Sequence, residues 1–166
     1  MPVPLVEVRS GVGDDEADRW TADLHRIISQ YADHKRWVVD QRERDASPAG
    51  FRRAVLAIRG PGAYARLRWL HGTHRVQREP PGSPGRIRTS TAVVLIEPLP
   101  GEVADRPDAD RRDASAKIRT CNYAEDRVTD HRIGLKLHGV DRLVEAHLDH
   151  LADRLEAAAG DGPGAA

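Results

Sequence analysis

The sequence predicts an α+β domain in which one mixed β-sheet is packed by two main amphipathic helices. Apolar residues recur at helical spacing in two stretches, one near each end of the chain. Between them lie short apolar segments separated by glycine and proline, the pattern of strands joined by turns. The 166 residues contain no internal repeat and fit one compact domain.

The first strand is expected over residues 2–9, with Val3 and Leu5 as its apolar positions and Val8 as a third candidate. Gly11 and Gly13 then stop the strand. Residues 14–16 are acidic, so they predict an N-cap and a negative first turn for a helix that ends near residues 33–35. The apolar stripe of this helix consists of Trp20, Leu24, Ile27, Ile28 and Tyr31.

The middle of the chain predicts further strands and one short helix. A second strand begins at Trp37 and is joined to a third over residues 51–59 by a loop around residues 47–50. A helical turn over residues 60–67 and a strand over residues 72–78 come next. The Pro/Gly loop of residues 80–85 precedes a long strand over residues 87–97, whose centre is apolar on both faces and therefore belongs in the middle of the sheet.

The last third combines a polar connector, two extended segments and a helix. Residues 99–112 are rich in Pro, Asp and Arg without periodicity. Residues 117–123 and 127–133 predict strands or extended segments, and residues 160–166 predict a disordered tail. The apolar stripe of the final helix consists of Val140, Leu143, Val144, Leu148, Leu151 and Leu155.

Composition excludes several classes of protein. No apolar run approaches the roughly 20 residues of a membrane span, and no signal or presequence begins the chain, which indicates a cytoplasmic location. Cys121 is the only cysteine, so an internal disulfide and a Cys-rich zinc site are excluded. The formal net charge is zero, and RNA affinity must therefore come from local patches. Almost all positive charge is arginine, which suits phosphate contacts, but the bias is better explained by a high-GC genome.

Neither histidine pair predicts a metal site. His71 and His74, and His147 and His150, are each three residues apart, but no carboxylate–histidine motif completes either set. We expect surface or packed histidines and no cofactor. The segment 130–132 (Asp-His-Arg) lacks a candidate nucleophile and predicts a structural role.

Five ordered blocks resemble bacterial class I peptide chain release factors and cover most of residues 5–155. Residues 62–78 (GAYARLRWLHGTHRVQR) resemble the stretch that enters the stop-codon-reading region of that family, and residues 85–91 (GRIRTST) resemble its Gly-Arg-Ile-His-Thr-Ser strand. Residues 117–123 (KIRTCNY) and 127–133 (RVTDHRI) are similar to two later blocks, and residues 8–17 (VRSGVGDDEA) to a glycine-tipped helix start.

The resemblance implies that the catalytic half of the family is missing. In the family a domain carrying Gly-Gly-Gln lies between the blocks at 85–91 and 117–123, whereas this sequence has no Gly-Gly pair. The resemblance therefore divides the chain into a codon-recognition region (1–98), a short connector replacing the catalytic domain (99–114), the rest of the same domain (115–159) and a tail (160–166). Ester hydrolysis needs a positioned nucleophile and a stabilised developing charge at the reacting bond, so we expect no hydrolase activity.

The resemblance also implies which residues face a codon or RNA, and several depart from the family pattern. Asp14 replaces a glycine, Arg88 replaces a base-stacking histidine, and residues 80–82 replace the specificity tripeptide. Loss of a base-edge hydrogen bond typically costs about 1–3 kcal/mol of discrimination, which argues against strict codon reading. The alternative is that the arginines form a solvated strand face. The candidate RNA-facing residues are Gly11, Gly13, Asp14, Arg75, Gln77, Arg78, Pro80, Pro81, Gly82, Arg86, Arg88 and Thr89.

The resemblance thus predicts a non-catalytic, ribosome-binding protein of translation termination or its regulation. Its expected partners are the decoding centre, ribosomal RNA and mRNA, with no membrane and no small-molecule substrate. An RNA- or protein-interaction module that acts away from the ribosome is the alternative, and a factor with a separate catalytic chain is a third hypothesis.

Overall fold

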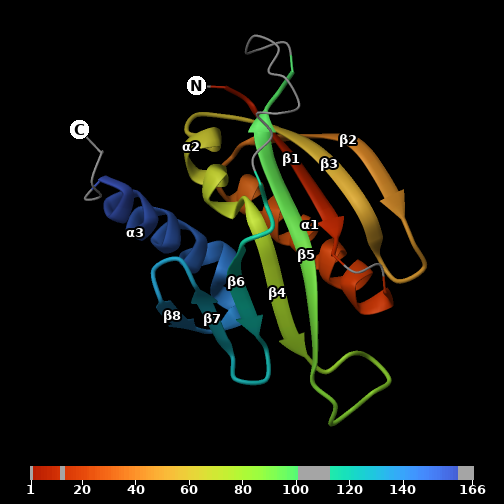
Figure 1. Ribbon diagram of the computed structural model, residues 1–166. Helices are drawn as coiled ribbons and strands as arrows, with labels where there is room; N and C mark the ends of the chain where they lie inside the picture. The colour runs from red at the N-terminus through yellow and green to blue at the C-terminus, as the bar shows by residue number, and fades with distance from the viewer. Residues whose placement is uncertain (1, 12–13, 101–112, 161–166) are drawn as a thin grey trace.

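One eight-stranded mixed sheet forms the framework of the protein (Figure 1). The computed structural model describes residues 2–11, 14–100 and 113–160. The strand order is β2-β3-β1-β5-β4-β6-β7-β8, and every neighbouring pair is antiparallel except the parallel pair β4–β6. The strands are β1 (Pro4–Ser10), β2 (Val38–Ala46), β3 (Phe51–Arg59), β4 (Gly72–Arg78), β5 (Arg88–Pro98), β6 (Lys117–Asn122), β7 (Arg127–Asp130) and β8 (Leu135–His138).

The helices cover one face of this sheet, and the two main amphipathic helices are confirmed. α1 (Asp15–His34) passes behind β1, β3 and β5 in Figure 1 and packs against all three strands. α2 (Ala63–Leu67) continues into the 3₁₀ turn η1 (Arg68–Leu70). The C-terminal run is irregular: the 3₁₀ turn η3 (Val140–Arg142) and the π-helical η4 (Leu143–His147) precede α3 (Leu148–Gly160). None of the described helices is long and apolar enough to cross a membrane.

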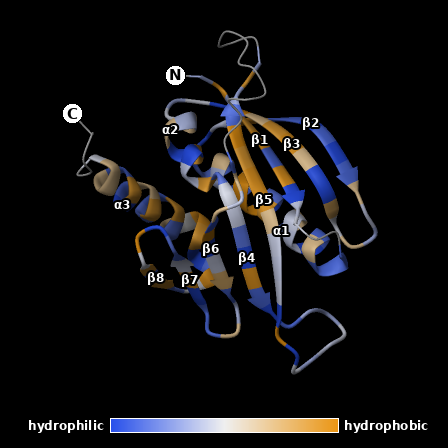
Figure 2. Ribbon diagram, viewed as in Figure 1, coloured by the Kyte–Doolittle hydropathy of each residue, from blue (hydrophilic) through white to orange (hydrophobic). Residues whose placement is uncertain are grey.

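The core lies between the helices and the inner face of the sheet. Val6, Leu56 and Val94 of three adjacent strands are fully buried against Trp20 and Ile28 of α1. The colouring in Figure 2 agrees with this arrangement, since the edge strand β2 is mostly hydrophilic and the central strand β5 is hydrophobic over much of its length. Full burial of such side chains contributes about 1.5–3 kcal/mol each.

The first strand lies close to its predicted range, and the alternation of its side chains decides which apolar residues are buried. Val6 and Val8 point into the core, whereas Leu5 is only half-buried on the opposite face. Because side chains alternate across a strand, Val8 sets the inner face, and Val3 and Leu5 cannot share it. Because β1 lies between β3 and β5, parts of both of its faces are buried, including the carboxylate of Glu7.

The predicted extended segment over residues 127–133 is shorter than expected. β7 ends at Asp130, and a turn with Gly134 in the left-handed region (φ +65°) leads into β8, which the sequence analysis missed. A strand of four residues is too short to produce a recognisable alternation. At the C-terminus, α3 extends through Gly160, and residues 161–166 lie outside the described residues.

The two ends of the predicted connector lie at the same end of the sheet. β5 runs antiparallel to β4, while β6 runs parallel to it, so the chain leaves β5 and enters β6 on either side of the beginning of β4. Thr73 Oγ1 donates to the carbonyl of Ala114 at 2.8 Å, which fixes the entry to β6. β5 runs on to Pro98, five residues beyond Val93, and both Val93 and the first residue of β6, Lys117, lie opposite Thr73. With strands about 4.8 Å apart and about 3.3 Å per residue, the end of β5 and the start of β6 are separated by about 19 Å. Residues 101–112 themselves lie outside the described residues.

Candidate nucleic-acid interface

The described candidate residues gather around one end of the sheet, where β1 and β4 end and β5 begins. Gln77 lies opposite Thr89, and Arg78 opposite Arg88, in the β4–β5 ladder. The amide of Gly11 donates to the carbonyl of Thr91 at 2.9 Å, which places the end of β1 beside β5. Of the predicted residues, Gly13 alone lies outside the described part of the chain.

Gly11 is required by the packing of β1 against β5. A Cβ atom at this position would lie 2.1 Å from Thr91 Oγ1 and 2.7 Å from the Thr91 carbonyl oxygen. Distances this short are incompatible with any side chain. The glycine therefore has a local structural reason that is independent of RNA.

Asp14 caps the first helix. Its Oδ1 accepts a hydrogen bond from the amide of Ala17 at 2.7 Å, while its backbone is extended, as expected of an N-cap. Asp15, Glu16 and Asp18 follow in the first turn, where acidic side chains interact favourably with the helix dipole. Only Asp14 and Asp15 are exposed among these acidic residues, so they carry the negative charge that this end of α1 presents to solvent.

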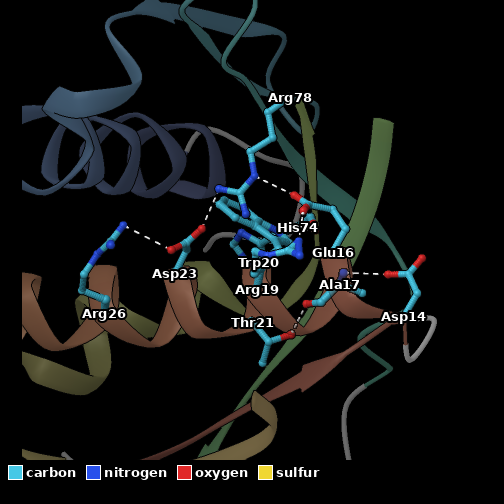
Figure 3. A network of polar contacts seen from close by, with 10 residues as sticks. All are labelled: Asp14, Glu16, Ala17, Arg19, Trp20, Thr21, Asp23, Arg26, His74 and Arg78. Atoms are coloured by element: carbon cyan, nitrogen blue, oxygen red, sulfur yellow. Dashed lines mark hydrogen bonds and ion pairs between the residues drawn. The ribbon is translucent and has the colours of Figure 1, made fainter. Parts of the chain in front are cut away.

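Arg78 points into the molecule, between α1 and the sheet (Figure 3). Its Nε donates to Glu16 Oε1 at 2.7 Å and its guanidinium to Asp23 Oδ2 at 2.5 Å. The guanidinium also lies over the rings of Trp20 and Tyr123, with its carbon 5.6 and 5.5 Å from the ring centroids. Burial lowers the pKa of Arg78, but the bonds to Glu16 and Asp23 outweigh it and raise the pKa above its usual value. Arg78 thus joins β4 to α1.

The same network anchors the buried start of α1. Glu16 is almost fully buried and accepts a second bond from Arg19 at 3.0 Å, so its charge is compensated on both oxygens. Trp20 Nε1 donates to the carbonyl of His74 at 3.0 Å, which fixes the middle of β4 against the helix (Figure 3).

Beneath the site, His74 is fixed as a buried neutral imidazole. Its Nε2 donates to the carbonyl of Leu70 at 2.7 Å, and burial, reinforced by the charge of Arg119, lowers its pKa to about 3. His74, Arg119 and Cys121 line a small cavity of about 10 Å³ under α1 and η4. The described residues contain no cluster of three or more groups suited to a metal ion.

The segment 130–132 has a structural arrangement. Asp130 is fully buried and accepts bonds from the backbone amide (3.0 Å) and guanidinium (2.7 Å) of Arg132, and it lies 3.6 Å from the guanidinium of Arg119. Burial raises the pKa of Asp130, but these cationic partners outweigh it and hold the pKa below its usual value. The imidazole of His131 contacts Thr120 Oγ1 at 2.6 Å.

The loop between β4 and β5 carries the most exposed basic residues of the site. Pro80 is buried, whereas Pro81 and Gly82 are exposed, and Gly82 and Gly85 adopt left-handed backbone conformations (φ +82° and +83°). The segment from Arg86 to Thr89 follows and is exposed throughout; Ile87 is 58% exposed. Arginine side chains here are available to a polyanion.

Arg75 and Gln77 lie half-buried on the outer face of β4. Gln77 Oε1 accepts from Asn122 Nδ2 at 3.1 Å across the parallel β4–β6 pair. Asn122 and Tyr123 therefore belong to the site, although sequence reasoning did not select them. The sequence signal that could have identified them is their position at the end of the block over residues 117–123, which is similar to the release factor family.

Three comparisons agree with this architecture. Residues 4–94 match the PCRF domain family. The chain is 30% identical over 232 positions to peptide chain release factor 1 of Lysinibacillus sphaericus, spanning 91% of this chain and 65% of the relative; for peptide chain release factor 1 of Sorangium cellulosum the figures are 29%, 91% and 64%. The fold matches RF2 of Thermus thermophilus with a TM-score of 0.82 and 19% identity, covering 97% of this chain and 69% of that chain. The chain belongs to the class I peptide chain release factor family.

The chain spans less than two thirds of the first of these relatives, and the missing part includes internal positions. The alignment to the Lysinibacillus protein runs over 232 positions, but 91% of this chain is only about 151 residues. About 80 positions of the relative therefore face gaps in this chain.

Proposed function

We propose that this chain is a non-catalytic, ribosome-binding factor of the cytoplasm that acts in translation termination or its regulation. The observation that carries the proposal is the exposed basic segment from Arg86 to Arg88 at the tip of a release-factor fold. Arginines on an exposed loop are suited to RNA phosphates and to stacking on bases. Arg78, in contrast, is held by Glu16 and Asp23, so it supports the loop from within.

The proposal includes that these 166 residues do not hydrolyse peptidyl-tRNA. They contain no Gly-Gly-Gln, and the gaps in the alignment to the Lysinibacillus relative leave room for a missing internal domain. Codon discrimination is expected to be weak, because Arg88 occupies the position of the base-stacking histidine that the family resemblance predicts.

The test is co-sedimentation with ribosome complexes that carry a stop codon, a sense codon or an empty A site, with peptide release followed in the same samples. We expect the protein to sediment with ribosomes without releasing peptide, and Arg88→Glu to weaken binding about tenfold. Arg154→Glu, the same charge change on the exposed side of α3, serves as the control and is expected to bind like the wild type.

A protein that never enters the ribosomal fraction would contradict ribosome binding and favour an interaction module that acts elsewhere. Peptide release by the purified chain would contradict the non-catalytic proposal. Equal binding to all three complexes would indicate that no stop codon is read.

A further inference from the structure

The outer face of β5, β4, β6, β7 and β8 carries a regular array of polar and basic side chains. Five residues lie side by side in one row across the five strands, as the registers of the four ladders require. In strand order this first row is Thr91, Arg75, Thr120, Thr129 and Lys136.

A second row lies two residues along each strand, and therefore on the same face. In the same strand order it is Thr89, Gln77, Asn122, Arg127 and His138. We call the ten residues of the two rows the polar grid. Val76, Cys121 and Val128, which lie between the rows in sequence, are buried in the core beneath α1 and η4, so the grid faces away from the helices.

The grid contains basic side chains but no acidic residue and no Phe, Tyr or Trp. Arg75 and Lys136 make no hydrogen bond or ion pair with their side chains among the described residues, and Lys136 is exposed. Arg127 is paired with Glu125 at 2.5 Å, so its charge is partly compensated. Asn122 and Gln77 bond to each other at 3.1 Å, and Thr120 bonds to His131.

The other half of the same face carries charges of both signs. Asp40, Glu43 and Asp45 of β2 lie in rows with Glu7 of β1 and Glu97 of β5. Arginines lie beside these carboxylates: Arg53 bonds to both Glu7 and Glu43, Arg42 lies 2.8 Å from Asp40, and Arg52 lies 3.8 Å from Asp45. The acidic residues of this half are thus largely neutralised by arginines, whereas Arg75 and Lys136 of the grid have no ionic partner among the described residues.

We infer that the polar grid binds the sugar–phosphate backbone of an RNA helix. Hydroxyl, amide, arginine and lysine groups are the side chains that contact phosphate and sugar, and the absence of Phe, Tyr and Trp argues against stacking on single-stranded bases. With strands about 4.8 Å apart, a row across five strands spans about 19 Å, the length of several successive phosphates.

The inference rests on the proposed function in one respect, namely that the ribosome is the source of this RNA. It extends the RNA contact from the loop between β4 and β5 to residues that the resemblance to the codon-reading region does not include. Thr129 and Lys136 are such residues. Thr120 belongs to the same row, but it is buried and its hydroxyl contacts His131, so it supports the face and does not itself reach the RNA. An acidic protein segment is the competing partner for a basic face, and the experiment separates the two.

The experiment measures binding of the purified full chain to a fluorescein-labelled RNA duplex of about 16 base pairs over a range of KCl concentrations. We expect Lys136→Glu to weaken binding about fivefold near 100 mM KCl, and to reduce the slope of log K against log [KCl] by about 0.9 for each phosphate that is no longer neutralised. Arg75→Gln removes one charge without adding another and is expected to show the smaller reduction of the slope. Arg154→Glu on α3 is the matched control.

Duplex binding that is unchanged by both grid variants would overturn the inference, and so would polyglutamate that binds the grid as tightly as the RNA duplex. Ribosome sedimentation distinguishes this failure from that of the proposed function. If ribosomes bind the wild type and Lys136→Glu equally well, the grid is excluded while the proposed function stands. If the duplex responds to the grid variants but ribosomes are not bound, the inference stands and the proposed function fails.

Discussion

His74 is a residue whose ionisation is coupled to folding. Its pKa is about 3 in the folded protein and about 6.5 in an unfolded chain, so the unfolded state binds the extra proton between these values. The stability that depends on neutral His74 is therefore complete above pH 6.5 and is lost as the pH falls toward 3. The slope approaches about 1.4 kcal/mol per pH unit where the unfolded histidine is protonated.

We expect His74→Gln to make the free energy of unfolding less dependent on pH between pH 6 and pH 5. Glutamine removes the titrating group and keeps a donor for the carbonyl of Leu70. Urea unfolding at several pH values measures the slope, and His150→Gln on the exposed surface of α3 is the control. A slope equal to that of the wild type would show that His74 does not carry this dependence.

Gly11 gives a second prediction at the scale of one residue. An alanine methyl group would meet both Oγ1 and the carbonyl oxygen of Thr91, so Gly11→Ala is expected to lower the unfolding free energy by about 1–3 kcal/mol. The double variant with Thr91→Ala should recover only part of this stability, because the backbone oxygen remains. Gly160→Ala, which meets no atom within 4 Å, should be close to neutral in the same thermal melts.

At the scale of elements, Asp149 fastens the start of α3 to α1. Its carboxylate accepts from Tyr31 at 2.6 Å and lies 2.6 Å from Lys35 Nζ, while Arg66 bonds to Asp153 one turn later. Burial raises the pKa of Asp149, but the bonds from Lys35 and Tyr31 outweigh it and keep the pKa below its usual value. The C-terminal helix is thus held to the rest of the molecule through α1 and α2.

Asp149→Ala is expected to lower the unfolding free energy by about 1–2 kcal/mol, since it leaves the partly buried Tyr31 hydroxyl without its acceptor. Asp153→Ala, on the same helix but 60% exposed at its side chain, should cost less than about 0.5 kcal/mol. Urea denaturation followed by circular dichroism measures both. Equal destabilisation in the two variants would contradict the assignment of the fastening role to Asp149.

At the scale of the whole molecule, the sequence predicts the elements that carry strong local signals. α1 has an acidic start and a continuous apolar stripe, and β4 is bounded by Gly72 and a Pro/Gly loop, so both boundaries were predictable. β8 and the π-helical turn η4 have no such signals, because their geometry is set by packing. The partners of Arg78 could not be predicted from the sequence either, because Glu16 and Asp23 belong to α1, far from Arg78 along the chain.

The polar grid is a further whole-molecule property that cannot be predicted from the sequence. Charges of both signs alternate along the chain and sum to zero. Only the registers of seven ladders decide which of them become neighbours, and register depends on pairing between distant segments.

The arrangement of β5 and β6 on either side of β4 has a consequence for the evolution and the engineering of this fold. The end of β5 and the start of β6 lie about 19 Å apart on either side of β4, and every ladder of the sheet forms without the intervening segment. A domain whose own termini lie at a similar separation can be exchanged at this position as a unit, leaving the host sheet unchanged. The position between β5 and β6 is accordingly suited to the insertion or removal of a whole domain, because the host sheet needs no change.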